Sequence, residues 1–84
     1  MLKKIVVVKA EIDEEFAGEI ARLCGKYEAR IGIETGKRTV RGTDSAGLVR
    51  SGVQAGERIR LMIEGAEEQQ AYEALRALIG KGAF

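Results

Sequence analysis

The hydrophobic pattern of this chain changes its period along the sequence, and this change limits the fold more than any other feature. The β-branched run Ile5–Val8 predicts a short strand over residues 3–9. Its apolar side chains point to both faces, so we expect the strand to lie in the centre of a sheet. From Asp13, apolar residues recur in steps of three and four up to Tyr27, which predicts an amphipathic helix that Gly25 ends.

The rest of the chain alternates between the same two periods. The predicted elements are a hairpin at 28–42, a short helix at 43–52, a strand at 57–65 and a helix at 66–79. Thr35-Gly36 favours a tight hairpin turn with positive φ, and Gly80 and Gly82 favour a frayed tail. The order strand, helix, strand, strand, helix, strand, helix predicts one α+β domain over residues 1–84, with the helices on one face of the sheet.

The composition limits the cellular compartment and the kinds of partner expected for this domain. The only cysteine, Cys24, has no partner for a disulfide, which indicates a reducing cytoplasm. The N-terminus lacks a cleavage pattern, and no apolar run is long enough to span a membrane. Fourteen basic and thirteen acidic residues give a net charge of +1, which removes the overall basic bias of a strong nucleic-acid binder.

A local basic patch is the second hypothesis for function. Seven basic residues are candidates for one side of the sheet: Arg30, Lys37, Arg38, Arg41, Arg50, Arg58 and Arg60. A solvated sheet face explains them without a ligand. The element order also suits a ferredoxin-like nucleic-acid or anion-binding domain, but the strand at 57–65 offers no aromatic side chain for stacking on bases, which argues against RNA.

The whole chain resembles HPr, the histidine-containing phosphocarrier of the bacterial sugar phosphotransferase system. The resemblance rests on the opening strand and helix and on the segments RIGIETGK (30–37), GVQAG (52–56) and IEGAEEQQA (63–71). It implies an open-faced β-sandwich of order βαββαβα, with a four-stranded antiparallel sheet and helices on one face. It also implies a protein that is not an enzyme and that needs no cofactor or metal.

The resemblance places the family's active centre at the start of the first helix. Family members carry a G-L-H-T-R-P type motif there, whose histidine accepts a phosphoryl group. The matching stretch is EIDEEF, which puts Asp13 at the histidine, Glu15 at the arginine and Phe16 at the proline. The chain contains no histidine. A phosphohistidine relay needs an imidazole nucleophile and positive charge around the phosphoryl oxygens, so we expect no phosphocarrier activity by that route.

The carboxylates of this stretch allow several interpretations. Asp13 caps the helix, and Glu14 and Glu15 oppose its macrodipole. Alternatively, the carboxylates replaced an anion site and now face a basic partner or a divalent cation. A third hypothesis is that Asp13 accepts phosphate itself, which requires a metal ion and a lysine nearby.

The family's regulatory serine, phosphorylated in many Gram-positive members, corresponds to Asp44. Asp44 caps the short helix, and its charge also imitates a phosphorylated serine in part. Thr43 and Ser45 flank it as candidate kinase targets. The candidate partner surface consists of Phe16, Ala46, Leu48 and Val49.

These residues predict a binding or regulatory module comparable to histidine-lacking HPr paralogues. The resemblance implies that its partner is a transcriptional regulator or a phosphotransferase-system component, with neither a membrane nor nucleic acid as the main partner. A module that only oligomerises is the remaining alternative.

Overall fold

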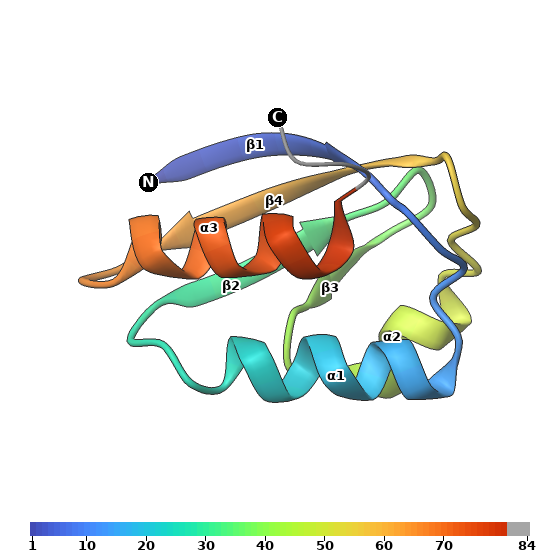
Figure 1. Cartoon of the computed structure of the whole chain (residues 1–84), viewed down its shortest axis with the longest axis horizontal. Coiled ribbons are helices and arrows are strands. Elements are labelled where there is room, and N and C mark those ends of the chain that lie inside the picture. The colour runs from blue at the N-terminus through green and yellow to red at the C-terminus, as the bar shows by residue number, and fades with distance from the viewer. Residues whose placement is uncertain (81–84) are drawn as a thin grey trace.

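Seven elements form the fold, in the predicted order βαββαβα. The structure is a computed structural model that describes residues 1–80. The strands are β1 (Leu2–Val7), β2 (Arg30–Glu34), β3 (Thr39–Arg41) and β4 (Arg58–Glu64), and the helices are α1 (Glu14–Cys24), α2 (Ser45–Arg50) and α3 (Glu68–Ile79). The helices lie on one side of the sheet (Figure 1). The predicted α+β class is therefore confirmed.

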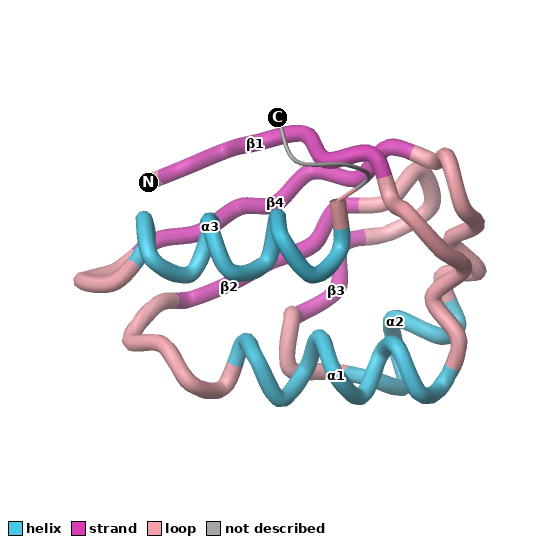
Figure 2. The backbone as a smooth tube through the Cα atoms, in the orientation of Figure 1, coloured by secondary structure: helices cyan, strands magenta, loops and turns pink. Residues whose placement is uncertain are grey.

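The four strands form one antiparallel sheet in the order β1-β4-β2-β3 (Figure 2). β4 and β2 lie in the centre and β1 lies at an edge, so the prediction of a central first strand is wrong. The register explains the error: Ile5 pairs with Arg60 on the open face and is 63% exposed. The apolar run thus covers the core with one face and leaves the other in solvent.

The core lies between the sheet and the helices. Alternate residues of β4, namely Ile59, Leu61 and Ile63, are at most 2% exposed. Ile20 of α1 and Leu75 of α3 are fully buried in the same cluster. Burial of each such side chain stabilises the fold by roughly 1.5–3 kcal/mol, which fixes both helices on the sheet.

The hairpin between β2 and β3 turns without a left-handed residue. The Thr35 N–H donates to Arg38 O at 2.8 Å, and Thr35 Oγ1 accepts from the N–H groups of Lys37 and Arg38, both at 3.2 Å. Gly36 is not among the residues with positive φ, so that prediction is wrong. The threonine hydroxyl satisfies the turn's donors, and no left-handed glycine is needed.

The end of α3 is tied to the end of β1. Lys9 N–H donates to Ile79 O at 2.9 Å, and Val8 forms an antiparallel bridge with Gly80. Gly80 is buried, so the predicted fraying does not begin there, because backbone pairing holds it. Gly82 lies outside the described residues.

Candidate functional site

Neighbouring backbone fixes the N-terminal end of α1. Ile12 is 2% exposed, and its N–H donates to Val53 O at 3.0 Å. Asp13 follows in an extended conformation, and its Oδ1 accepts a hydrogen bond from Phe16 N–H at 2.9 Å. A side-chain cap of this kind stabilises a helix by about 1 kcal/mol. The predicted capping role of Asp13 is confirmed.

The cap and its neighbours supply four exposed carboxylates: Glu11, Asp13, Glu14 and Glu15. None of them forms an ion pair within residues 1–80. An anion 4 Å from one of these charges would be repelled by about 1 kcal/mol in water and by about 4 kcal/mol at an effective dielectric constant of 20. The N–H of Phe16, a donor suited to an anion at a helix start, is already used by Asp13. The tip of α1 therefore disfavours anions.

A shallow pocket of about 270 Å³ adjoins this tip. Its lining consists of Lys9, Ala10, Glu11, Asp13, Glu15, Phe16, Glu19 and Leu78. The hypothesis that Asp13 accepts phosphate requires a lysine nearby, and the fold brings Lys9 to the same pocket, because β1 ends just before α1. No three His, Cys, Asp or Glu side chains among residues 1–80 are grouped to hold a metal ion. The metal-assisted phosphate hypothesis for Asp13 thus gains a lysine but lacks a set of metal ligands in that part of the chain.

Asp44 caps α2 in the same way that Asp13 caps α1. Its Oδ1 accepts a hydrogen bond from Gly47 N–H at 3.0 Å. A Cβ at Gly47 would lie 2.6 Å from Asp44 Oδ2, so glycine lets the carboxylate approach the helix closely. Thr43 is exposed and Ser45 is half-buried. Of the two hydroxyl-bearing candidate positions, Thr43 is thus the more accessible residue.

The predicted partner surface is only partly at the surface. Leu48 is fully buried and Phe16 is 8% exposed, because both side chains pack into the core. Phe16 also lines the acidic pocket. The other two residues, Ala46 and Val49, line a second pocket of about 460 Å³ with Glu14, Ser45 and Arg50. The accessible surface therefore spans α2 and the first turn of α1.

The open face of the sheet is predominantly basic. The register places five basic and two acidic side chains on it: Lys3, Arg30, Arg41, Arg58 and Arg60, with Glu34 and Glu64. One half-exposed ion pair, Arg60 to Glu34 at 3.6 Å, joins two of them. The expectation that basic residues gather on one side of the sheet is met for four of the seven named, since the others lie in the hairpin turn or on α2.

Cys24 closes the other end of α1. It is 3% exposed and belongs to the core, as its place in the helical stripe indicates. Burial raises the pKa of its thiol from 9.0 to about 11. The thiol therefore stays protonated at neutral pH, which does not suit a redox nucleophile.

The sequence model of one protein family, described as "PTS HPr component phosphorylation site", matches residues 3–81. The chain belongs to the HPr family. A comparison with curated protein sequences found no match. Among the described residues, no helix has the length and apolar character needed to cross a membrane.

Solved structures of HPr proteins share this fold. The phosphocarrier protein HPr of Bacillus anthracis superposes with a TM-score of 0.87 at 25% identity, over 93% of this chain and 95% of that one. HPr-C-His of Thermoanaerobacter tengcongensis gives 0.86 at 25% identity, over 94% and 91%. Crh of Bacillus subtilis gives 0.74 at 23% identity, over 87% and 84%, a likeness that shows the fold alone.

Proposed function

We propose that this HPr-family protein does not carry phosphohistidine and acts instead as a binding or regulatory module in the cytoplasm. It is not an enzyme, and its partner is a protein: a phosphotransferase-system component or a transcriptional regulator. The chemistry at the tip of α1 is the observation that carries the first part. The surface between α1 and α2 supports the second.

The tip of α1 lacks what phosphoryl transfer requires. Asp13, which matches the family's histidine, has its carboxylate engaged with Phe16 N–H at 2.9 Å. Glu15, which matches the arginine, adds negative charge where the family has positive charge. A phosphoryl group arriving here would find a carboxylate in place of the imidazole nucleophile and a second carboxylate in place of the guanidinium that holds its oxygens.

Regulation through α2 is the second part of the proposal. Asp44 stands at the family's regulatory serine, and it supplies a permanent charge that resembles phosphoserine with about half the charge and fewer acceptor oxygens. Thr43 and Ser45 are the adjacent hydroxyls that a kinase would modify. A protein bound over Ala46 and Val49 would contact Asp44 as well, because all three lie on or beside α2.

Phosphoryl transfer is tested by incubating the protein with phosphoenolpyruvate and the general phosphotransferase enzyme, followed by intact mass measurement. We expect no added phosphoryl mass, while a histidine-bearing HPr in the same tube gains one. A labile phosphoryl adduct on this chain would overturn the first part of the proposal.

Partner binding is tested by pull-down from a lysate of the host organism with three bait proteins: the wild type, Ala46→Glu and Ala77→Glu. Ala46→Glu places a charge in the α2 pocket, and Ala77→Glu places the same charge on an exposed alanine of α3. The proposal requires a partner that Ala46→Glu loses and Ala77→Glu retains. Identical retention by both variants would contradict a partner surface on α2.

The role of the Asp44 charge is separated from its capping role by Asp44→Asn. Asparagine caps a helix about as well as aspartate but carries no charge. If the charge imitates phosphoserine, Asp44→Asn weakens partner binding without changing the melting temperature. Unchanged binding would leave Asp44 as a cap only.

Anion binding by the basic open face is the second candidate, favoured by its five basic side chains. Among residues 1–80 this face carries no aromatic side chain, which removes the stacking platform of RNA-binding domains. Salt-dependent retention on heparin would support it, because phosphate contacts weaken steeply as salt rises.

A further inference from the structure

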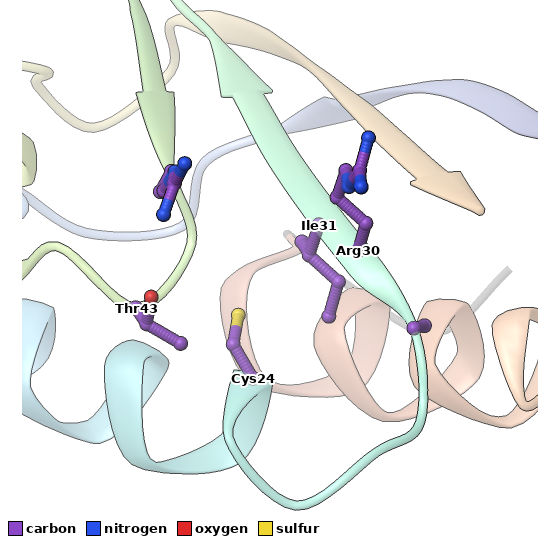
Figure 3. Close-up of a pocket in the computed structure, with 6 residues that line it drawn as sticks. Cys24, Arg30, Ile31 and Thr43 are labelled. Carbon is purple, nitrogen blue, oxygen red and sulfur yellow. The ribbon is translucent and has the colours of Figure 1, made fainter. Parts of the chain in front are cut away.

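A pocket of about 460 Å³ opens where β2 begins and β3 ends, far from the acidic tip of α1. Six residues line it: Cys24, Ala29, Arg30, Ile31, Arg41 and Thr43. In Figure 3, Arg30 and Ile31 come from β2, Thr43 from the segment after β3, and Cys24 from the end of α1. Cys24 and Ile31 are buried, whereas Arg30, Arg41 and Thr43 are exposed. The pocket thus has an apolar floor and a polar, basic rim.

Two glycines lie beside this pocket. Gly32 pairs with Arg41 in the sheet, and Met62 of β4 packs over it on the open face, where a Cβ would lie 3.3 Å from Met62 Cε. Gly42 donates its N–H to Ile31 O at 2.9 Å, and a Cβ there would lie 2.5 Å from Cys24 Sγ. Any side chain at Gly42 would therefore disturb the floor of the pocket. The close approach of backbone and thiol shapes the cavity.

The rim presents unpaired positive charge. Within residues 1–80, neither Arg30 nor Arg41 forms an ion pair. Glu64 pairs with Arg30 in the sheet register, but no bridge within 4.0 Å joins them. Two more carboxylates lie beside the pocket: Glu28 is exposed and precedes it on the chain, and Glu67 Oε1 accepts a hydrogen bond from the Glu28 N–H at 2.8 Å. The protonated thiol of Cys24 adds no negative charge to the floor at neutral pH.

We propose that this pocket binds a small phosphate monoester. Arg30 and Arg41 hold the dianionic phosphoryl group from two strands, and the Thr43 hydroxyl donates to a third oxygen. The carbon part of the ester rests on Ala29 and Ile31. Guanidinium groups suit phosphate because each can donate two parallel hydrogen bonds to its oxygens. The site shares Thr43 with the regulatory positions beside α2 but none of the residues that line the α1–α2 pocket, so this proposal does not depend on the proposed partner.

Titration of the ¹⁵N-labelled protein with phenyl phosphate, inorganic phosphate and phenyl sulfate at constant ionic strength tests the site. Phenyl phosphate combines a dianion with an apolar group, so it should bind at least about tenfold more tightly than phenyl sulfate, which has a single charge, and more tightly than inorganic phosphate, which has no apolar group. Saturable shifts should centre on the amides of Ala29, Gly42 and Thr43. Absence of saturation by about 20 mM, or equal binding of phenyl sulfate, would overturn the proposal.

Three variants with glutamine in place of arginine test which arginines bind the phosphoryl group. Arg30→Gln and Arg41→Gln should each weaken phenyl phosphate binding by about tenfold, as loss of a charged hydrogen-bond donor predicts. Arg58→Gln is the matched control: it removes an exposed arginine from the same face, but at the other end of β4, about 20 Å away at 3.3 Å per residue. Arg58→Gln should change the affinity by less than about twofold. Equal loss in all three would mean that the whole basic face attracts anions without a defined site, and would reject the pocket.

Discussion

The two ends of α1 differ in what they offer a charged ligand. At its N-terminal end the exposed charges are negative, and Asp13 occupies a backbone donor with its own carboxylate. At its C-terminal end Cys24 forms the floor of a pocket with two guanidiniums on its rim, and neither is paired with a carboxylate in the described chain. Negative charge at the N-terminal end and positive charge at the C-terminal end both complement the helix macrodipole. The two ends therefore differ both in the sign of the exposed charge and in whether the protein leaves its donors unsatisfied, and the proposed site lies where both conditions favour an anion.

The largest effect should come from filling the floor of the basic pocket. Gly42→Val should lower the free energy of unfolding by about 3 kcal/mol, because its side chain would overlap Cys24 and Ile31. Urea denaturation measures the loss. Gly36→Val is the matched control, since nothing lies within 4 Å of a Cβ at Gly36. Adding Cys24→Ala to Gly42→Val should recover part of the stability, and failure to do so would place the strain elsewhere.

Because Cys24 lies buried in the floor of the same pocket, the free energy of unfolding should fall as the pH rises into the alkaline range. The pKa of Cys24 is about 11 in the folded protein, against 9.0 ordinarily. Below pH 9 both states keep the proton, and the full stability is present. Between these two values the unfolded chain loses the proton while the folded chain retains it, so unfolding becomes easier by about 2 kcal/mol. Urea denaturation across this range should show a steeper fall for wild type than for Cys24→Ala, and parallel curves would contradict the burial of the thiol.

A smaller change should follow from removing the cap at the acidic end. Asp13→Ala leaves Phe16 N–H without its acceptor and should lower the free energy of unfolding by about 1 kcal/mol. Asp13→Asn keeps an acceptor and should lower the free energy of unfolding by only roughly a few tenths of a kcal/mol. Thermal denaturation distinguishes them. Equal destabilisation by both variants would show that the charge of Asp13, rather than its hydrogen bond, supports the helix.

The smallest effect should be a gain in the middle of the same helix. Gly18→Ala should stabilise the protein by about 0.7 kcal/mol, because alanine favours the helix and its Cβ would meet only Arg22 Nη1, at 3.7 Å. Gly47→Ala in α2 should do the opposite, since its Cβ would lie 2.9 Å from Val40 Cγ1 and closer to Asp44. Equal signs for both would contradict the packing described for the two helices.

Local features of the sequence were sufficient for the elements and their caps. The β-branched run, the apolar stripe of α1 and the caps at Asp13 and Asp44 each depend on residues a few positions apart, so they could be predicted. The place of β1 at the sheet edge could not, because strand order depends on which distant strand it pairs with. Phe16 and Leu48 were assigned to a surface for the same reason, since docking of the helices on the sheet decides their burial.

The basic pocket was missed although its arginines were named. Arg30 and Arg41 lie on opposite strands of the hairpin, and only the register, with Gly32 opposite Arg41, brings them to one rim. The two glycines that interrupt the apolar and basic alternation were the available signal. Cys24 lies in the site only because α1 packs on the sheet, and no local sequence pattern predicts that packing.

The pairing of β1 also has a consequence for synthesis. This strand leaves the ribosome first within the domain, yet its neighbour in the sheet is β4, the last strand to be made. Until β4 emerges, Val6 and Val8 have no cover, and the nascent chain presents the kind of exposed apolar strand that chaperones bind and that aggregates when translation stalls.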